Sequence, residues 1–280
     1  MKKTNRGKTI FLICFLSFLV VVLLFFMISV IFGWLPIRVF SFSSYQVSKE
    51  LAYEKIYDVN FQEIQVDASL GDIEVLPSND EMVHVLIYSD RDLFDVDSTS
   101  SNLSIVFREE EGFHFSLPRS KDLIKIYVPD STKSSFLLLS DYGDIRVKEF
   151  SNASFDVTAN MGDISVLKAK KVEVDNDMGD VTIGSVRNLK VIQDMGDLEV
   201  DTVSSKLSIE SDMGDVFLKD VSLKYNSKII SNLGNVEIEN ISNAYVDTKV
   251  DLGEVDIRDN NREAPYTLTI QSDMGDITVG

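Results

Sequence analysis

One seven-residue pattern recurs nine times in this 280-residue chain and constrains its fold more than any other feature. Its fullest form is D-M-G-D followed by apolar, polar and apolar residues, as in D-M-G-D-V-T-I from Asp177 and D-M-G-D-L-E-V from Asp194. The last eight of its glycines are 17 to 22 residues apart. A short, nearly constant period is typical of solenoids, whose units bury their apolar faces only by stacking on one another. The central glycines are Gly71, Gly143, Gly162, Gly179, Gly196, Gly214, Gly234, Gly253 and Gly275.

The residues on either side of each glycine alternate between apolar and polar side chains. Around Gly179, Val172 and Val174 precede the glycine by seven and five residues, and Val181 and Ile183 follow it by two and four. A period of two indicates strands. The apolar phase shifts by one residue at Gly-Asp, so we predict a corner there, where glycine reaches positive φ without a Cβ penalty. The fold class is therefore all-β, a parallel β-solenoid with about 17 to 22 residues per coil and successive coils about 4.8 Å apart.

An apolar residue, most often methionine, stands directly before each corner glycine. We place this column in the inward phase and predict that its flexible side chains pack coil on coil. The column consists of Leu70, Tyr142, Met161, Met178, Met195, Met213, Leu233, Leu252 and Met274.

The pattern lapses between Gly71 and Gly143. Alternating stretches at 81–89, 103–110, 113–117 and 123–128 still indicate strands, separated by turn residues. We expect an antiparallel cap or insertion at about 78–130 within a solenoid domain spanning 59–280. Because the chain stops five residues after Gly275, we expect the coil around Asp276 to Val279 to be an uncapped end, which would offer a surface for self-association.

Residues 9–34 form an uncharged apolar run. As a helix at 1.5 Å per residue, this run is long enough to cross a bilayer core of about 30 Å. Four basic residues precede it, which favours a cytoplasmic tail at 1–8, a transmembrane helix at 9–34, a stalk at 35–58 and an extracellular solenoid. A cleaved signal peptide is the alternative, although its apolar core is usually about 7 to 15 residues long.

The charge of the chain limits its partners. Of 27 basic residues, four lie before position 9, so 23 basic residues face all 45 acidic residues in the remainder, a net charge of −22. Nucleic acids and anionic lipid headgroups are therefore excluded as favoured partners of this part. Cys14 is the only cysteine, so no disulfide can form within one chain.

Two mostly acidic columns flank the corner glycines. Neighbouring carboxylates about 4.8 Å apart repel by roughly 1 kcal/mol even at the dielectric constant of water, so an offsetting interaction is needed. Either the aspartates accept backbone N–H groups, as in Asx-turns, or calcium bridges adjacent coils. The calcium alternative would use Asp177, Asp180, Asp194, Asp197, Asp212 and Asp215.

Catalysis is not expected. An active site needs one unrepeated constellation, whereas the acids here are the most repetitive residues of the chain. His84 and His114, the only histidines, lie in alternating strand-like stretches, and no nucleophile motif, zinc-ligand spacing or phosphate loop occurs. We predict a non-enzyme with no cofactor other than the calcium considered above.

An apolar amino-terminal segment followed by G-D-[IV]-x-[VI] strand repeats resembles the bacterial putative-adhesin β-strand-repeat family, which includes the LiaG-like envelope proteins. The resemblance covers about residues 55–280. It implies a right-handed parallel β-solenoid on the cell surface, often beside envelope-stress or membrane-sensing genes. Two roles follow as hypotheses: a binding module whose acidic flank meets a cationic peptide, a basic wall component or a membrane-protein loop, and a structural module that self-associates through its carboxy-terminal coil.

Overall fold

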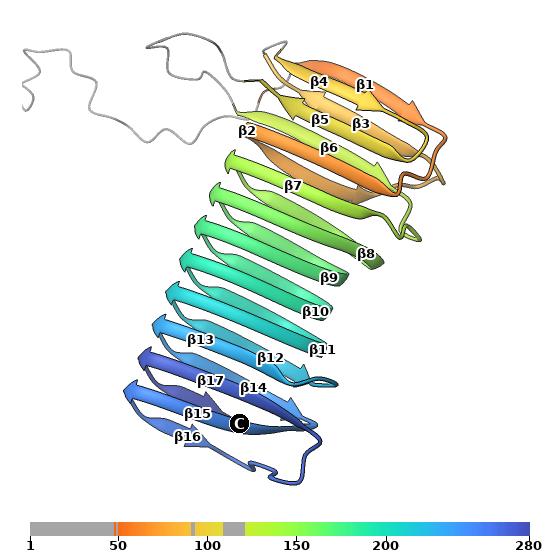
Figure 1. The fold of residues 1–280 in the computed structure, drawn as a ribbon. Helices are drawn as coiled ribbons and strands as arrows, with labels where there is room; N and C mark the ends of the chain where they lie inside the picture. Colours follow the sequence, from red (N-terminus) through yellow and green to blue (C-terminus); the bar gives the residue numbers. More distant parts are fainter. Residues whose placement is uncertain (1–47, 49, 91–92, 109–120) are drawn as a thin grey trace, which may run out of the picture. The chain divides into compact units, whose positions relative to one another are not determined.

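The computed structural model describes residues 48, 50–90, 93–108 and 121–280, and within these ranges the chain forms strands and turns without a helix (Figure 1). The predicted tail at 1–8 and transmembrane helix at 9–34 lie outside these residues. In the ranges that are described, nothing qualifies as a membrane-crossing helix.

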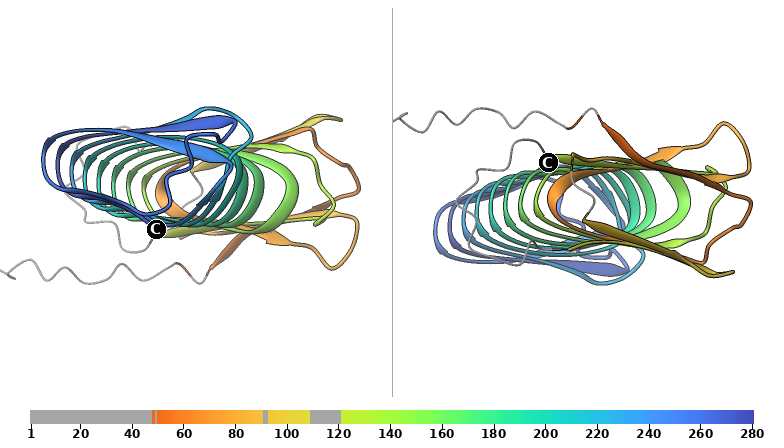
Figure 2. Two further views of the ribbon diagram at one scale, coloured as in Figure 1. Left: turned by 90° about the horizontal axis from the view of Figure 1, so that it is seen from below. Right: turned by 90° about the horizontal axis from the view of Figure 1, so that it is seen from above.

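The regular part of the solenoid is built from long strands that each run from one corner to the next. Pairs of neighbouring strands are parallel and in register, so that Met178 lies beside Met195 and Met195 beside Met213. Each strand bends midway, and seen along the stack the coils form flattened loops with two facing walls (Figure 2). These strands are β8 (Ile145–Met161), β9 (Ile164–Met178), β10 (Val181–Met195) and β11 (Leu198–Met213).

The predicted apolar phase forms the core. Val172, Val174, Val181 and Ile183 are all at most 3 % exposed, and the equivalent residues of the other regular coils stack above and below them. Every described core residue, from Tyr57 to Val279, belongs to one continuous cluster. Residues 46–280 form a compact unit of their own, so a fragment with these bounds contains a complete core and is expected to fold alone.

The amino-terminal end is a mixture of parallel and antiparallel pairing. The two halves of β2 (Glu63–Pro77) pair in parallel with β7 (Ser135–Tyr142) and β8 on one side and with β5 (Asn102–Phe107) and β6 (Asp122–Val128) on the other. The antiparallel additions are β3 (Val83–Tyr88) on β6, β4 (Phe94–Ser98) on β5, and β1 (Leu51–Tyr57) on β3. The segment at 78–130 thus contributes another parallel coil as well as antiparallel strands.

At this end, one expectation from the sequence is corrected and another falls outside the described residues. Residues 51–57, which we placed in a stalk, form β1 and pair with β3. The reason is that the end of the core must be covered, and Tyr53 contacts Phe94 across it with ring centroids 6.1 Å apart. The strand expected at 113–117 lies outside the described residues.

At the other end, the order of the coils in space differs from their order in the chain. β12 (Val216–Ser222) and β13 (Ser227–Leu233) continue the stack, followed by β14 (Val236–Ser242). The last strands, β17 (Tyr266–Met274) and β18 (Ile277–Val279), then lie between β13 and β14 on one side and β15 (Ala244–Leu252) and β16 (Val255–Ile257) on the other. Figure 1 shows β17 between β13 and β15.

This insertion corrects the expectation that Asp276 to Val279 form the open end. Ile277 and Val279 are fully buried, whereas Val255 in β16 is 44 % exposed. Backbone pairing between parallel strands is the same for either order of coils, so side chains decide which coil is sandwiched. Ile270 of β17 is fully buried, and its counterpart in β15 is the polar Thr248.

Candidate interaction edge

The corners stack into one edge of the solenoid, and glycine is required there for two reasons. Gly214 has a φ of 139°, a conformation that other residues rarely adopt. A Cβ added to Gly214 would lie 1.9 Å from the carbonyl oxygen of Gly196, the glycine of the preceding coil. The prediction of positive φ is confirmed for seven of the nine glycines. Gly143 requires close approach instead, because its Cβ would lie 2.0 Å from the oxygen of Gly71.

The backbone groups of each corner are paired with the next coil. The Gly179 N–H donates to the Met195 carbonyl at 3.1 Å, and the Val181 N–H donates to the Asp197 carbonyl at 2.9 Å. The same two bonds recur at the neighbouring corners, for example from Gly196 to Met213 and from Leu198 to Asp215. Each corner therefore adds the same two backbone hydrogen bonds between neighbouring coils.

A buried polar column supports the corners from inside, which the sequence analysis missed. Asn176, three residues before Gly179, is 1 % exposed and donates from Nδ2 to the Gly179 carbonyl at 2.8 Å. Gln193 donates to the same oxygen at 2.8 Å, and Ser231 donates to the Gly234 carbonyl at 3.2 Å. The available signal was a polar residue recurring in an otherwise apolar phase. Buried carbonyls need donors, so this column stabilises the corner.

The acidic column after the glycines forms a continuous chain of hydrogen bonds between coils. The Oδ1 atom of Asp163 accepts the N–H of Asp180 at 3.0 Å, Asp180 accepts that of Asp197 at 2.9 Å, and Asp197 accepts that of Asp215 at 2.9 Å. Asn235 takes the same place and accepts the N–H of Asp276 at 3.0 Å. Backbone N–H acceptance was one of our two alternatives, but the donor lies one coil away rather than in the same turn.

The second acidic column, two residues before the glycines, is fully outward over the central coils. Asp177, Asp194 and Asp212 occupy consecutive coils and are all exposed. Asparagines replace aspartate on two coils and relieve the repulsion there, with Asn160 donating to Asp141 at 2.9 Å and Asn232 donating to Asp212 at 2.7 Å. Between these asparagines, the carboxylates face solvent.

Basic residues pair with carboxylates of the edge near its two ends. At the carboxy-terminal end, Lys249 Nζ lies 3.6 Å from Asp251 Oδ1. Asp72 is 6 % exposed and lies 2.6 Å from Lys121 Nζ. Arg146 reaches the next carboxylate, Asp144, at 2.6 Å. Burial raises the pKa of nearby Asp67, and the charge of Asp141 adds to this. Farther along, the central coils keep their negative charge.

The calcium hypothesis finds no assembled site in this geometry. The six carboxylates named for it lie in two rows as predicted, but in the described ranges no three His, Cys, Asp or Glu side chains gather as a metal site requires. Calcium binding stays a prediction for experiment.

The column directly before the glycines points outward, so our prediction that it packs inside the solenoid is wrong. Met178 and Met195 are both 41 % exposed, and Met213 is 49 % exposed. The corner takes four residues, because the inward phase stops at the buried amide column and resumes two residues after the glycine. D-M-G-D therefore lies outside the core, and an apolar column runs between the two acidic columns.

These coils match a known domain. The family model described as Toastrack DUF4097 matches residues 61–280. The chain belongs to this family. The predicted resemblance to the putative-adhesin repeat proteins is confirmed by this family match and by a solved structure of similar fold that carries that description.

Two solved structures are similar to this chain at low sequence identity. A "putative adhesin" from Bacteroides fragilis is 17 % identical, with a TM-score of 0.52, and the match covers 84 % of this chain and 99 % of that one. A "putative lipid binding protein" from Parabacteroides distasonis is 14 % identical, with a TM-score of 0.47, and covers 84 % of this chain and 99 % of its own. No curated protein matches the sequence.

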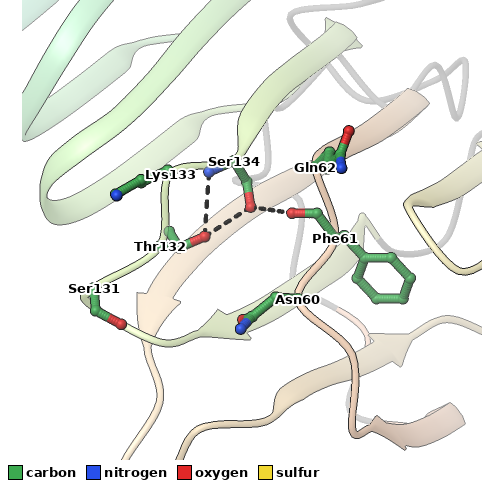
Figure 3. A pocket seen from close by; sticks show the side chains of 7 residues that line it. All are labelled: Asn60, Phe61, Gln62, Ser131, Thr132, Lys133 and Ser134. Atoms are coloured by element: carbon green, nitrogen blue, oxygen red, sulfur yellow. Dashed lines mark hydrogen bonds between the residues drawn. The ribbon is translucent and has the colours of Figure 1, made fainter.

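The Toastrack domain also carries a shallow pocket of about 360 Å³ where the turn at 129–134 meets β2 (Figure 3). Two of its three hydroxyls have partners: Thr132 and Ser134 share a hydrogen bond of 2.7 Å, and Ser134 donates to the Phe61 carbonyl. Its lining includes no carboxylate or histidine. These two hydroxyls hold the turn against the residues that lead into β2.

His84 is the one predicted histidine within the described residues. Its Nε2 lies 2.9 Å from Asp80 Oδ1 on the exposed side of β3, and this hydrogen bond lowers the pKa of the Asp80 carboxyl. The His84 ring also lies edge-on to Tyr127 of β6, with ring centroids 6.4 Å apart, so these contacts link β3 to β6 and to the turn before β3. His114 lies outside the described residues.

Proposed function

We propose that this protein is a non-catalytic cell-surface module that binds a cationic partner along its corner edge. The observation that carries this proposal is the run of outward carboxylates on the central coils, formed by Asp177, Asp194 and Asp212. The ion pairs of the described residues involve other carboxylates. Repulsion along such a row falls when a cationic partner binds, which favours binding.

The proposed location is the outer face of a bacterial membrane, with the solenoid held there by the apolar segment at 9–34. The basic residues at 2, 3, 6 and 8 support a cytoplasmic amino terminus. The family resemblance supports an accessory role in envelope stress. In that role the partners would be cationic peptides or basic wall components.

Binding of an oligolysine peptide to the fragment 46–280 tests this function. We expect binding at about 0.05 M salt that weakens strongly at about 0.5 M, because exposed charge pairs are screened within a Debye length. Asp177→Asn, Asp194→Asn and Asp212→Asn together should weaken binding several-fold. Asparagine already occupies this column at Asn160 and Asn232, so the variant should keep the fold.

The matched control neutralises three exposed acids far from the corner edge, Glu149→Gln, Asp201→Asn and Glu239→Gln. This control removes the same charge from the molecule and should bind almost as well as the parent fragment. Equal losses in both variants would show that only net charge matters and would reject the corner edge as the site. Absence of binding at low salt would reject the function itself.

A further inference from the structure

The apolar column between the two acidic columns is a built surface feature. Seven consecutive coils carry an exposed apolar side chain here from Met161 onward, with exposures from 37 % at Met161 to 62 % at Leu252. Strand register places each beside the next, including Leu233 beside Met274 and Met274 beside Leu252. With Leu70 and Tyr142 the column spans nine coils, or about 38 Å at 4.8 Å per coil.

The composition of the column shows what it offers. Methionine fills five places, and leucine or tyrosine fills the other four. What the places share is apolar surface rather than sulfur, which argues against a site for thiophilic metals. A continuous exposed apolar strip is uncommon on soluble proteins and marks interaction surfaces, and methionine adapts to partners of varied shape.

We propose that this column, named here the methionine ladder, is the binding site of an amphipathic cationic helix that lies along the solenoid axis. The inference rests on the proposed function and adds the partner's shape: an apolar stripe against the ladder, with Lys or Arg on both sides of the stripe facing the acidic columns. A helix is about 10–12 Å wide, comparable to the four-residue corner D-M-G-D. The full ladder matches a helix of about 25 residues.

Charge complementarity selects this occupant over two others. A second copy placed corner to corner would bring the carboxylates around Asp194 and Asp197 against their equivalents, where like charges cost free energy. An anionic membrane surface is repelled for the same reason. A cationic helix meets the apolar ladder and both acidic columns at once.

The test compares two peptides of identical composition with the fragment 46–280. One is an amphipathic Lys/Leu helix of about 25 residues, and the other is its scrambled isomer, in which the leucines are spread around the helix. We expect the amphipathic peptide to bind about tenfold or more tightly than the isomer, because only it buries apolar surface against the ladder. Fluorescence anisotropy measures both affinities.

The decisive variant carries Met178→Ser, Met195→Ser and Met213→Ser, and should erase the preference while leaving the salt-dependent binding of both peptides. Its matched control is Leu167→Ser with Tyr225→Ser, two apolar residues off the ladder that are 42 % and 60 % exposed. The control should keep the preference. Circular dichroism of each variant checks that the fold is unchanged.

The outcomes separate the two proposals. Equal binding of the two peptides would overturn the methionine ladder as the binding site, and so would a preference for the amphipathic peptide that persists in the methionine variant. Either result would leave the proposal of the acidic edge unchanged. Lack of binding by either peptide at low salt would overturn both. Sedimentation of the free fragment gives the last outcome: a dimer that the methionine variant dissociates would make a second copy the occupant and overturn the helix.

Discussion

The two ends of the solenoid differ in how the last layer of the apolar core is covered. At the amino-terminal end, antiparallel strands and aromatic side chains close the core, as when Phe94 packs on Phe107 with ring centroids 5.6 Å apart. At the other end, the outermost coil consists of β15 and β16. It has the backbone of an ordinary coil of the repeat but fewer buried apolar side chains. Asn260 pairs with both the N–H and the carbonyl of Val246, at 2.9 and 2.8 Å, in place of one more strand.

The difference teaches that side chains can mark the outermost coil of a repeat while its backbone pairing stays the same. β15 keeps the corner glycine and the backbone ladder, but it places Thr248 where other coils have an aliphatic residue. A coil with one stacked neighbour gains less from an apolar side chain there, because one side of the residue stays near solvent. The coil with the better core residues, β17 and β18, lies inside.

The largest expected effect compares a regular corner with the corner nearest the closed end. Gly214→Ala should cost more than about 3 kcal/mol or prevent folding, because the residue needs positive φ and its Cβ would overlap a backbone oxygen. Gly71→Ala should cost less, since its nearest contact would be Asp122 Cβ at 3.1 Å. Urea unfolding of the fragment 46–280 measures both, and equal costs would contradict this account of the corners.

The next effect tests the inserted order of the last coils. Ile270→Thr should cost about 2–3 kcal/mol by placing a hydroxyl in a fully buried site. Thr248→Ile should change the free energy of unfolding by about 0.5 kcal/mol or less, or stabilise the fold, because this coil is outermost. The reverse ranking would mean that the coils stack in chain order.

The smallest effect concerns the carboxylate column after the glycines. Asp180→Asn, Asp197→Asn and Asp215→Asn should each stabilise the fragment by a few tenths of a kcal/mol at low salt, since the amide oxygen still accepts the N–H and repulsion falls. Asn235 already works in this way. A loss of stability that grows in calcium would contradict the hydrogen-bond account.

Calcium supplies the complementary measurement. We expect the Tm of the fragment to be the same in millimolar calcium and in chelator, because backbone N–H groups already occupy one oxygen of Asp180, Asp197 and Asp215 in the column after the glycines. A higher Tm in calcium that disappears in these asparagine variants would restore the metal hypothesis.

Much of the site could be predicted from the sequence, and the failures have physical causes. Period two around Gly179 and Gly196 predicts the walls, the corners and both acidic rows. The direction of Met178 could not be read, because strict alternation places it inside and only the four-residue corner turns it outward. The amide column of Asn176 and Gln193 was visible as polar residues, but their partner is a carbonyl that only the folded corner points inward.

By itself, the sequence determined that each coil has two apolar walls and a glycine corner, because these depend on residues close together in the chain. Tertiary structure alone decided that the last coil enters between two earlier ones and that the methionine ladder faces solvent. Backbone ladders between parallel strands accept any coil in register, so the order of coils follows from which side chains gain most from two neighbours. That gain exists only after the coils have stacked.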